Sequence, residues 1–226
     1  MAKRPLFIPQ KKRVGLIRID VDFEYVSGQA SVQKRKCVRS LHKSIKNMGY
    51  IENPLEVSTA SECELGIKTS AFNLNIIDEE KGELVLESVY HATKVFKNHG
   101  VELSLLRMGA RESKKRANAL LKKYGVIEGY HYRGIDFPEE PKSLCFTWLY
   151  FQALKYLPTK ELSFLAQFDG FTDLNFKIDS MGNCQAHAMA LFVSIYNHGI
   201  YEPWALTLPC LQSYLMDMDT SLKCSL

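Results

Sequence analysis

Four polar side chains recur at helical spacing near the middle of the chain. Glu87, Tyr90, His91 and Lys94 stand at positions i, i+3, i+4 and i+7, so in a helix they would share one face. A carboxylate, a phenol, an imidazole and an amine side by side could transfer protons and, through the amine, attack an electrophilic carbon. Spacing alone equally allows an ordinary solvated helix face.

Positive charge is concentrated in three clusters, although the net charge of the 226-residue chain is only +4. In chain order the clusters are Lys3, Arg4, Lys11, Lys12 and Arg13; Lys34, Arg35, Lys36 and Arg39; and Arg107, Arg111, Lys114, Lys115, Arg116, Lys122 and Lys123. Any one cluster could simply be a solvated surface. Three of them together favour an anionic partner, because basic clusters attract the phosphates of nucleic acids and nucleotide-like ligands.

The composition narrows the class of protein. A hydrophobic content of 46% and a charged content of 24% are typical of a soluble globular protein. No apolar run approaches the roughly 20 residues of a membrane span, and no secretory signal opens the chain, which predicts a cytoplasmic location. The six cysteines show no CxxC pair or zinc-ligand spacing, so neither a metal nor a cofactor is expected. Cys184 precedes Gln185 without a protease signature around it.

The hydrophobic pattern predicts a mixture of strands and helices. Alternating apolar and polar residues from 17 to 25 predict a half-buried strand, and two further short strands are expected over 54–59 and 66–77. Helical spacing follows in a larger number of segments, namely 31–48, 87–98, 102–108, 111–124, 142–157, 159–167 and 183–198. With residues 1–13 taken as a flexible basic arm, the prediction is a single α+β domain over 14–226. It would be mostly helical, with a small sheet from the N-terminal third.

Several polar motifs follow one another in a fixed order. They are Ser70-Ala-Phe72, Glu87-x-x-x-His91-Ala-x-Lys94, Arg107 with Arg111-Glu-Ser-Lys114-Lys115, Asp169-x-Phe171 and Asn183. This order resembles the NADAR (YbiA-like) superfamily, and the opening residues and Glu140-Pro-Lys142 resemble one branch in particular. That branch comprises antitoxin-like proteins encoded beside DNA ADP-ribosyltransferase toxins. His91 stands where the superfamily often has glutamine, and Thr172-Asp173 replaces its usual Trp-Gly pair.

The resemblance implies an ADP-ribosyl glycohydrolase that removes ADP-ribose from guanine bases of DNA. Such an enzyme would reverse a toxin's modification, as a host antitoxin or as a phage counter-defence protein. Lys94 would attack the anomeric carbon of the ribose, or capture its open-chain aldehyde as a Schiff base. Glu87 would be the acid/base and Asp169 would assist. An N-glycosidic bond breaks through a cationic state that carboxylates stabilise, and a lysine nucleophile needs a lowered pKa.

The resemblance also suggests which residues hold the substrate. The predicted set comprises Ser70, Phe72, His91, Arg39, Arg107, Lys114, Phe137, Phe171, Asp173 and Asn183. The basic members would bind the pyrophosphate and the phenylalanines would stack on a base. The N-terminal arm and residues 34–36 would follow a DNA strand. The implied partners are ADP-ribosylated DNA as substrate, ADP-ribose as product and a DNA ADP-ribosyltransferase toxin as functional counterpart.

Two other functions remain open from the sequence. One is an N-glycosidase of a small nucleotide-like metabolite, such as a riboflavin-pathway intermediate, and the basic arm argues against it. The other is a non-catalytic module that binds ADP-ribose. The presence of both Glu87 and Lys94 argues against that module, because binding alone requires neither residue.

Overall fold

The N-terminal residues form a strand at the centre of a sheet. In the computed structural model, which describes residues 1–28, 30–176 and 184–223, β1 (Ala2–Pro9) pairs antiparallel with β2 (Leu16–Phe23) along its whole length. On its other side β1 pairs antiparallel with β10 (Gly170–Thr172), which runs parallel to β3 (Pro54–Glu56). The flexible arm expected for residues 1–13 is therefore wrong, because Leu6 and Phe7 are buried in the core. The domain starts with β1 and not at residue 14.

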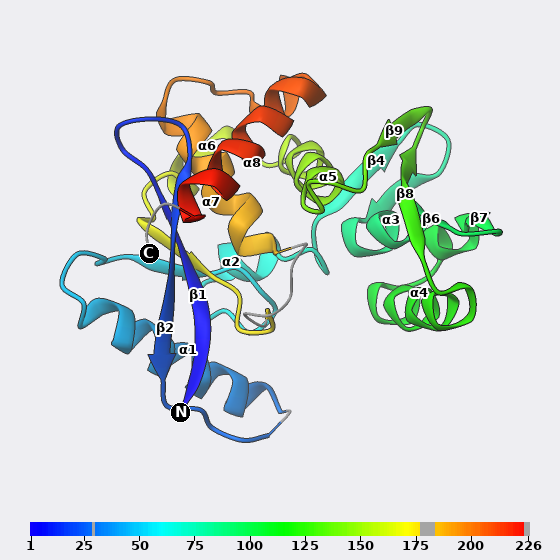
Figure 1. Cartoon of the computed structure of the whole chain (residues 1–226). Coiled ribbons are helices and arrows are strands. Elements are labelled where there is room, and N and C mark those ends of the chain that lie inside the picture. Colours follow the sequence, from blue (N-terminus) through cyan, green and yellow to red (C-terminus); the bar gives the residue numbers. More distant parts are fainter. Residues whose placement is uncertain (29, 177–183, 224–226) are drawn as a thin grey trace.

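Helix α1 (Ser31–Lys46) covers part of this sheet, as the sequence pattern predicts. Its buried residues Cys37, Val38, Leu41 and Ile45 pack with apolar residues of β1 and β2 in one cluster. Figure 1 shows α1, β1 and β2 together on one side of the view, with α3, α4 and β8 on the other.

Residues 64–85 form a short helix and a hairpin where one strand was expected. Helix α2 (Glu64–Lys68) precedes the hairpin of β4 (Asn75–Asp78) and β5 (Gly82–Val85). A Cβ at Gly66 would collide with the carbonyl oxygen of Glu56 and the hydroxyl of Ser61. The absence of a side chain at Gly66 therefore lets α2 pack directly against the end of β3. The strand expected over 66–77 is wrong in its first half, where α2 and the turn after it lie.

The middle of the chain contains a second four-stranded sheet that the sequence pattern did not predict. Its order is β7 (Gly100–Val101), β6 (Lys94–Phe96), β8 (Ile127–Tyr132) and β9 (Ile135–Phe137), with antiparallel neighbours. Helix α3 (Leu86–Ala92) leads into β6, so the helix expected over 87–98 ends early. A 3-10 turn, η1 (Leu103–Arg107), and helix α4 (Ala110–Tyr124) then pack against α3.

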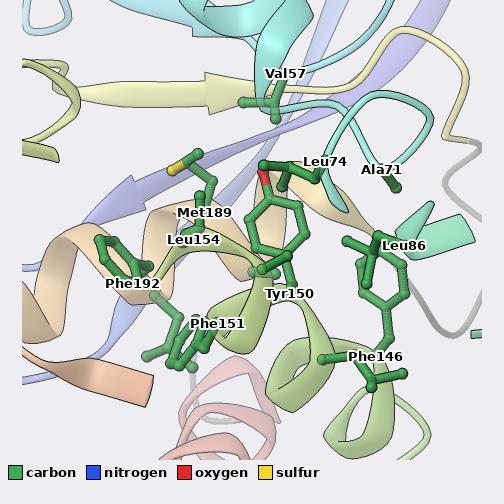
Figure 2. Packing of buried hydrophobic residues seen from close by; sticks show 14 of the residues in the cluster. Val57, Ala71, Leu74, Leu86, Phe146, Tyr150, Phe151, Leu154, Met189 and Phe192 are labelled. Carbon is green, nitrogen blue, oxygen red and sulfur yellow. The ribbon is translucent and has the colours of Figure 1, made fainter. Parts of the chain in front are cut away.

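The C-terminal part supplies the centre of the core. Helices α5 (Leu144–Leu154), α6 (Thr159–Leu165) and α7 (Gln185–Asn197) fall within the predicted segments, and η2 (Pro203–Ala205) and α8 (Leu208–Lys223) follow. Figure 2 shows Tyr150 and Phe151 of α5 beside Met189 and Phe192 of α7. The Tyr150 hydroxyl donates a hydrogen bond of 2.7 Å to the Thr69 carbonyl, which anchors the turn that follows α2.

These elements make an α+β fold, as predicted, with strands distributed beyond the N-terminal third. The largest apolar cluster takes residues from Phe7 to Leu215, so the two halves of the chain share a core. Across the ranges 1–28, 30–176 and 184–223, no helix combines the length and the apolar character needed to cross a lipid bilayer.

Candidate active site

Helix α3 is buried on every side, which excludes a solvated face for the Glu87 motif. Leu86 and Val89 are fully buried in the main core, while Glu87 is 7% and His91 4% exposed. The backbone N–H of Glu87 donates to the Ala71 carbonyl at 3.0 Å, so the start of α3 is held against the turn that contains Ser70 and Phe72. A carboxylate and an imidazole buried in this way need polar partners.

The partners of Glu87 and His91 are one another and Lys94. His91 Nε2 lies 3.3 Å from Glu87 Oε1, and His91 Nδ1 lies 3.0 Å from Lys94 Nζ. An ionised carboxylate only accepts hydrogen bonds, so Nε2 donates to Glu87 and Nδ1 accepts from the Lys94 ammonium. Helix α3 ends at Ala92, and Lys94 is the first residue of β6, where it pairs with Tyr130 of β8. From this position the Lys94 side chain reaches His91. The three side chains form a hydrogen-bonded line of amine, imidazole and carboxylate.

The burial of this line changes the acidity of each member. Burial lowers the pKa of Lys94 to about 8, although the charge of Glu87 opposes the change. Burial also lowers the pKa of His91, against the hydrogen bond to Glu87. For Glu87 burial alone would raise the pKa, but the His91 hydrogen bond and the Lys114 charge outweigh it and hold the pKa below its ordinary value. At neutral pH the line therefore holds a carboxylate, a neutral imidazole and an ammonium that loses its proton unusually easily.

A second lysine approaches Glu87 from the opposite direction. Lys114 Nζ of α4 lies 3.2 Å from Glu87 Oε1, and its side chain is 53% exposed. The same ammonium lies 5.7 Å from the centre of the Phe72 ring, and Lys94 Nζ lies 4.9 Å from the centre of the Tyr90 ring. Because the buried face of α4 packs on the core through Ser113, Ala117 and Leu120, Lys114 is directed towards the site.

These groups line a cavity of about 580 Å³, a volume typical of ligand pockets. Its surface comes from α1, α3, α4, α5, the start of β6, the start of α7 and the turns after α2, β3 and β10. The residues are Lys34, Ser58, Thr59, Ser70, Ala71, Phe72, Glu87, Tyr90, His91, Lys94, Arg111, Lys114, Asn118, Phe146, Asp173, Asn175, Phe176 and Gln185. Lysines and an arginine surround an opening large enough for a nucleotide-sized anion.

The side of the cavity across from α3 contains a different acidic pair. Asp173, directly after β10, lines the cavity, and Glu56 at the end of β3 is buried behind it. Glu56 accepts hydrogen bonds from the Thr172 hydroxyl at 2.7 Å and from the Leu174 N–H at 2.8 Å. Burial, reinforced by the charge of Asp173, raises the pKa of Glu56 to about 8, and burial raises the pKa of Asp173 to about 6. At neutral pH Glu56 therefore retains its proton.

Seven of the predicted site residues meet in the cavity. They are Glu87, Lys94, Ser70, Phe72, His91, Lys114 and Asp173. Residues whose role in the site sequence reasoning missed include Glu56, Asn118, Asn175, Phe176 and Gln185. Gln185 accepts the Ala71 N–H at 2.8 Å, so it joins the start of α7 to the turn after α2. A signal for Glu56 was present, since an acidic residue between Leu55 and Val57 interrupts an otherwise apolar strand.

Asp169 does not lie in the cavity. Its two carboxylate oxygens accept the backbone N–H groups of Glu52 at 2.8 Å and Asn53 at 2.9 Å. The aspartate therefore fixes the loop that leads into β3. The assisting role expected for it gains no support from this position, because both carboxylate oxygens are engaged by the loop.

Four other predicted contacts also lie elsewhere. Phe171 is fully buried opposite Phe7, and Phe137 packs on Trp148 with ring centres 5.5 Å apart, so neither ring is available for stacking on a base. Arg39 forms an exposed ion pair with Glu62, and Arg107 lies beside a separate hollow next to β5. Asn183 falls outside the described residues.

No group of histidine, cysteine, aspartate or glutamate side chains suited to a metal ion occurs within the described part of the chain. Comparison with known families identifies a match. The model described as the DarT1-associated NADAR antitoxin matches residues 2–208. The chain belongs to this family. A search of curated proteins finds no match.

Membership of the NADAR antitoxin family confirms the branch that the sequence motifs indicate. The matched region runs from β1 to the first residue of α8, so it includes every residue that lines the cavity. The antitoxin family is thus matched over the whole site.

Proposed function

We propose that the chain is an ADP-ribosyl glycohydrolase that removes ADP-ribose from guanine bases of DNA, and that it thereby counteracts a DNA ADP-ribosyltransferase of the DarT1 type. The observation that carries the proposal is the line from Lys94 through His91 to Glu87 in a basic cavity. A nucleophile, a proton carrier and a carboxylate within hydrogen-bond reach are the groups that glycosidic cleavage requires. The family description, an antitoxin associated with DarT1, supports the substrate.

The first step is the activation of Lys94. The ammonium donates its proton to His91 Nδ1 while His91 passes its Nε2 proton to Glu87. The result is a neutral amine, a neutral imidazole whose proton now lies on Nδ1 instead of Nε2, and a carboxylic acid. The lowered pKa of Lys94 makes this transfer easier by about 1.4 kcal/mol for each unit.

The second step breaks the glycosidic bond. Lys94 Nζ attacks the anomeric carbon of the ribose as the bond to the guanine nitrogen breaks, and Glu87 gives its proton to the departing base. The carboxylate of Asp173 and that of Glu87, once its proton has left, stabilise the positive charge that develops on the sugar. The lysine adduct then opens to a Schiff base, water adds to its carbon, and ADP-ribose leaves as Lys94 is regenerated. One water molecule is consumed overall.

Residues around the opening would hold the rest of the substrate. Lys34 and Arg111 lie on the cavity surface with Lys114, and they can neutralise the two phosphates of ADP-ribose. The Phe72 ring, beside the Lys114 ammonium, presents an aromatic surface to a base. Asp173 can accept hydrogen bonds from ribose hydroxyls.

The test is direct. Single-stranded DNA carrying ADP-ribosylated guanine is incubated with the protein, and released ADP-ribose is measured beside Lys94→Ala and Glu87→Ala. We expect release by the wild type and loss of at least about a thousandfold in both variants. If the wild type releases no ADP-ribose, the proposal is wrong.

The covalent step has its own experiment. Borohydride reduces a Schiff base to a stable amine, so treatment during turnover should attach ADP-ribose to Lys94 and add its mass to the peptide that contains this residue. Lys94→Ala should give no adduct. Release of ADP-ribose by the wild type without any trapped adduct would show that water attacks the sugar directly.

A further inference from the structure

The cavity continues onto an exposed basic surface of α4. A shallow hollow of about 470 Å³ on this helix is lined by Arg111, Lys114, Lys115, Asn118, Ala119 and Lys122. Three of these residues, Arg111, Lys114 and Asn118, also line the cavity. The two hollows therefore share an edge, and a chain that emerges from the cavity past Lys114 meets the outer face of α4.

The cations on this face are regularly spaced. Arg111, Lys115 and Lys122 follow one another at helical intervals, so they form a stripe about 16 Å long with Asn118 between them. All three are exposed, and among the described residues none of them forms an ion pair. Lys114, in contrast, is already bound to Glu87. The stripe keeps its positive charge for an external partner.

We propose that this stripe, comprising Arg111, Lys115, Asn118 and Lys122, binds the sugar–phosphate backbone of the nucleic-acid strand next to the modified base. This inference rests on the proposed function, and it names the surface that distinguishes a polymeric substrate from a small one. A stacked strand carries one phosphate about every 3.4 Å, so the stripe faces several successive phosphates. Contacts of this kind give affinity without sequence preference. The strand follows α4, and not β1 or residues 34–36 as the sequence suggested.

Helix α4 supplies its own control. Arg116 and Lys123 are also exposed, but Arg116 is two residues beyond Lys114, about 200° round the helix. The pair Arg116 and Lys123 therefore lies on the flank of α4 that faces away from the cavity. Reversing either pair changes the net charge of the protein by the same amount. The control variant in addition loses the contact of Lys123 with the Tyr124 ring, whose centre lies 4.9 Å from Lys123 Nζ.

The experiment compares Lys115→Glu/Lys122→Glu with Arg116→Glu/Lys123→Glu on two substrates. On ADP-ribosylated single-stranded DNA, the stripe variant should raise KM at least about tenfold, while the control variant stays near the wild type. On ADP-ribosylated guanosine, which has no neighbouring phosphates, both variants should match the wild type. Equal KM values for the two variants on DNA would overturn the proposal, as would equal losses on the nucleoside.

Binding of a short, unmodified, fluorescein-labelled DNA strand tests the surface without catalysis. For Lys115→Ala/Lys122→Ala, the plot of log affinity against log salt should become shallower by about 1.4, at about 0.7 for each phosphate that the variant no longer neutralises. If the wild type fails to release ADP-ribose from any substrate, the proposed function falls and this measurement still decides the surface. Loss of DNA affinity in Arg35→Glu/Lys36→Glu but not in the α4 stripe variant would place the strand on α1 and overturn the proposal.

Discussion

Two buried glutamates, Glu87 in the cavity wall and Glu56 beside the cavity residue Asp173, behave in opposite ways. Glu87 accepts a hydrogen bond from the neutral His91 and forms an ion pair with Lys114, and its pKa lies below the ordinary value. Glu56 has hydroxyl and backbone partners near Asp173, and its pKa rises to about 8. Both side chains are removed from water to a similar extent. Burial favours the neutral form of both groups, and the partners make the difference: His91 and Lys114 outweigh burial at Glu87, whereas the charge of Asp173 adds to it at Glu56.

The largest expected effect is the difference in kcat between the Glu87→Gln and Glu56→Gln variants. Glu87→Gln removes the group that receives the proton of Lys94, so kcat for ADP-ribose release should fall by about a thousandfold. Glu56→Gln replaces a protonated carboxyl by a neutral group of the same shape and should stay within about threefold of the wild type. Similar losses of activity in the two variants, with both folded by circular dichroism, would contradict the different roles of the two glutamates.

The pH dependence of kcat tests whether activity requires the proton of Lys94. In the proposed mechanism the proton of Lys94 is used later by Glu87, so activity requires that this proton be present. We expect kcat to decline above pH about 8, by up to about tenfold for each further unit, because the pKa of Lys94 is about 8. A rate that rises through pH 8 would show instead that the free amine acts without a proton on Glu87.

The variant His91→Gln tests whether the imidazole passes a proton between Lys94 and Glu87. A glutamine can donate to Glu87 and accept from Lys94, but it cannot pass a proton between them. We expect kcat to fall by about tenfold with little change in KM, and the decline above pH 8 to be lost. An unchanged pH profile with a lower kcat would indicate that His91 only holds the two neighbours in place.

The smallest expected effect is a pH-dependent change in the melting temperature of Glu56→Gln. The folded state holds a proton on Glu56 up to pH about 8, whereas an unfolded glutamate loses it near pH 4.5, so folding becomes less favourable as pH rises through this window. Glu56→Gln should match the wild type at pH 5 and melt a few degrees higher at pH 8.5. The Thr172 hydroxyl can turn towards His42 to accommodate the amide, because burial lowers the pKa of His42 to about 4 and leaves it neutral. Thermal melts of both proteins at pH 5 and pH 8.5 test this expectation, and equal melting temperatures at pH 8.5 would contradict it.

The hydrophobic pattern predicted α1, α4, α5, α6 and α7 well. Helices α1 and α4 bury one regular apolar face, and α5 and α7 are apolar and buried over most of their length. The short strands were harder. Lys94–Phe96 and Ile135–Phe137 have three residues each, too few for an alternating pattern, and β10 is recognisable only through its distant partners β1 and β3. β1 was taken for an arm because its lysine and arginine masked the buried run at Leu6 and Phe7.

The site could be predicted where its residues are close in sequence, and not where the fold brings distant residues together. Glu87, His91 and Lys94 are close in sequence, and their spacing indicated a shared location even though Lys94 lies beyond the helix. From the sequence, Asp169 was expected to assist catalysis and Asp173 to bind the substrate. Only the fold separates them, because they stand at opposite ends of β10, with Asp169 at the Glu52 loop and Asp173 at the cavity.

The position of β10 has a consequence for synthesis of the protein on the ribosome. β1 is the first element of the chain, yet its second neighbour, β10, lies about 160 residues later, and Asp173 and Gln185 of the cavity follow β10. Helix α3 with Glu87 and His91 has by then long been translated. The cavity therefore closes only after β10 and the start of α7 have been translated, and a nascent chain that stops before β10 carries Lys94 without an assembled site.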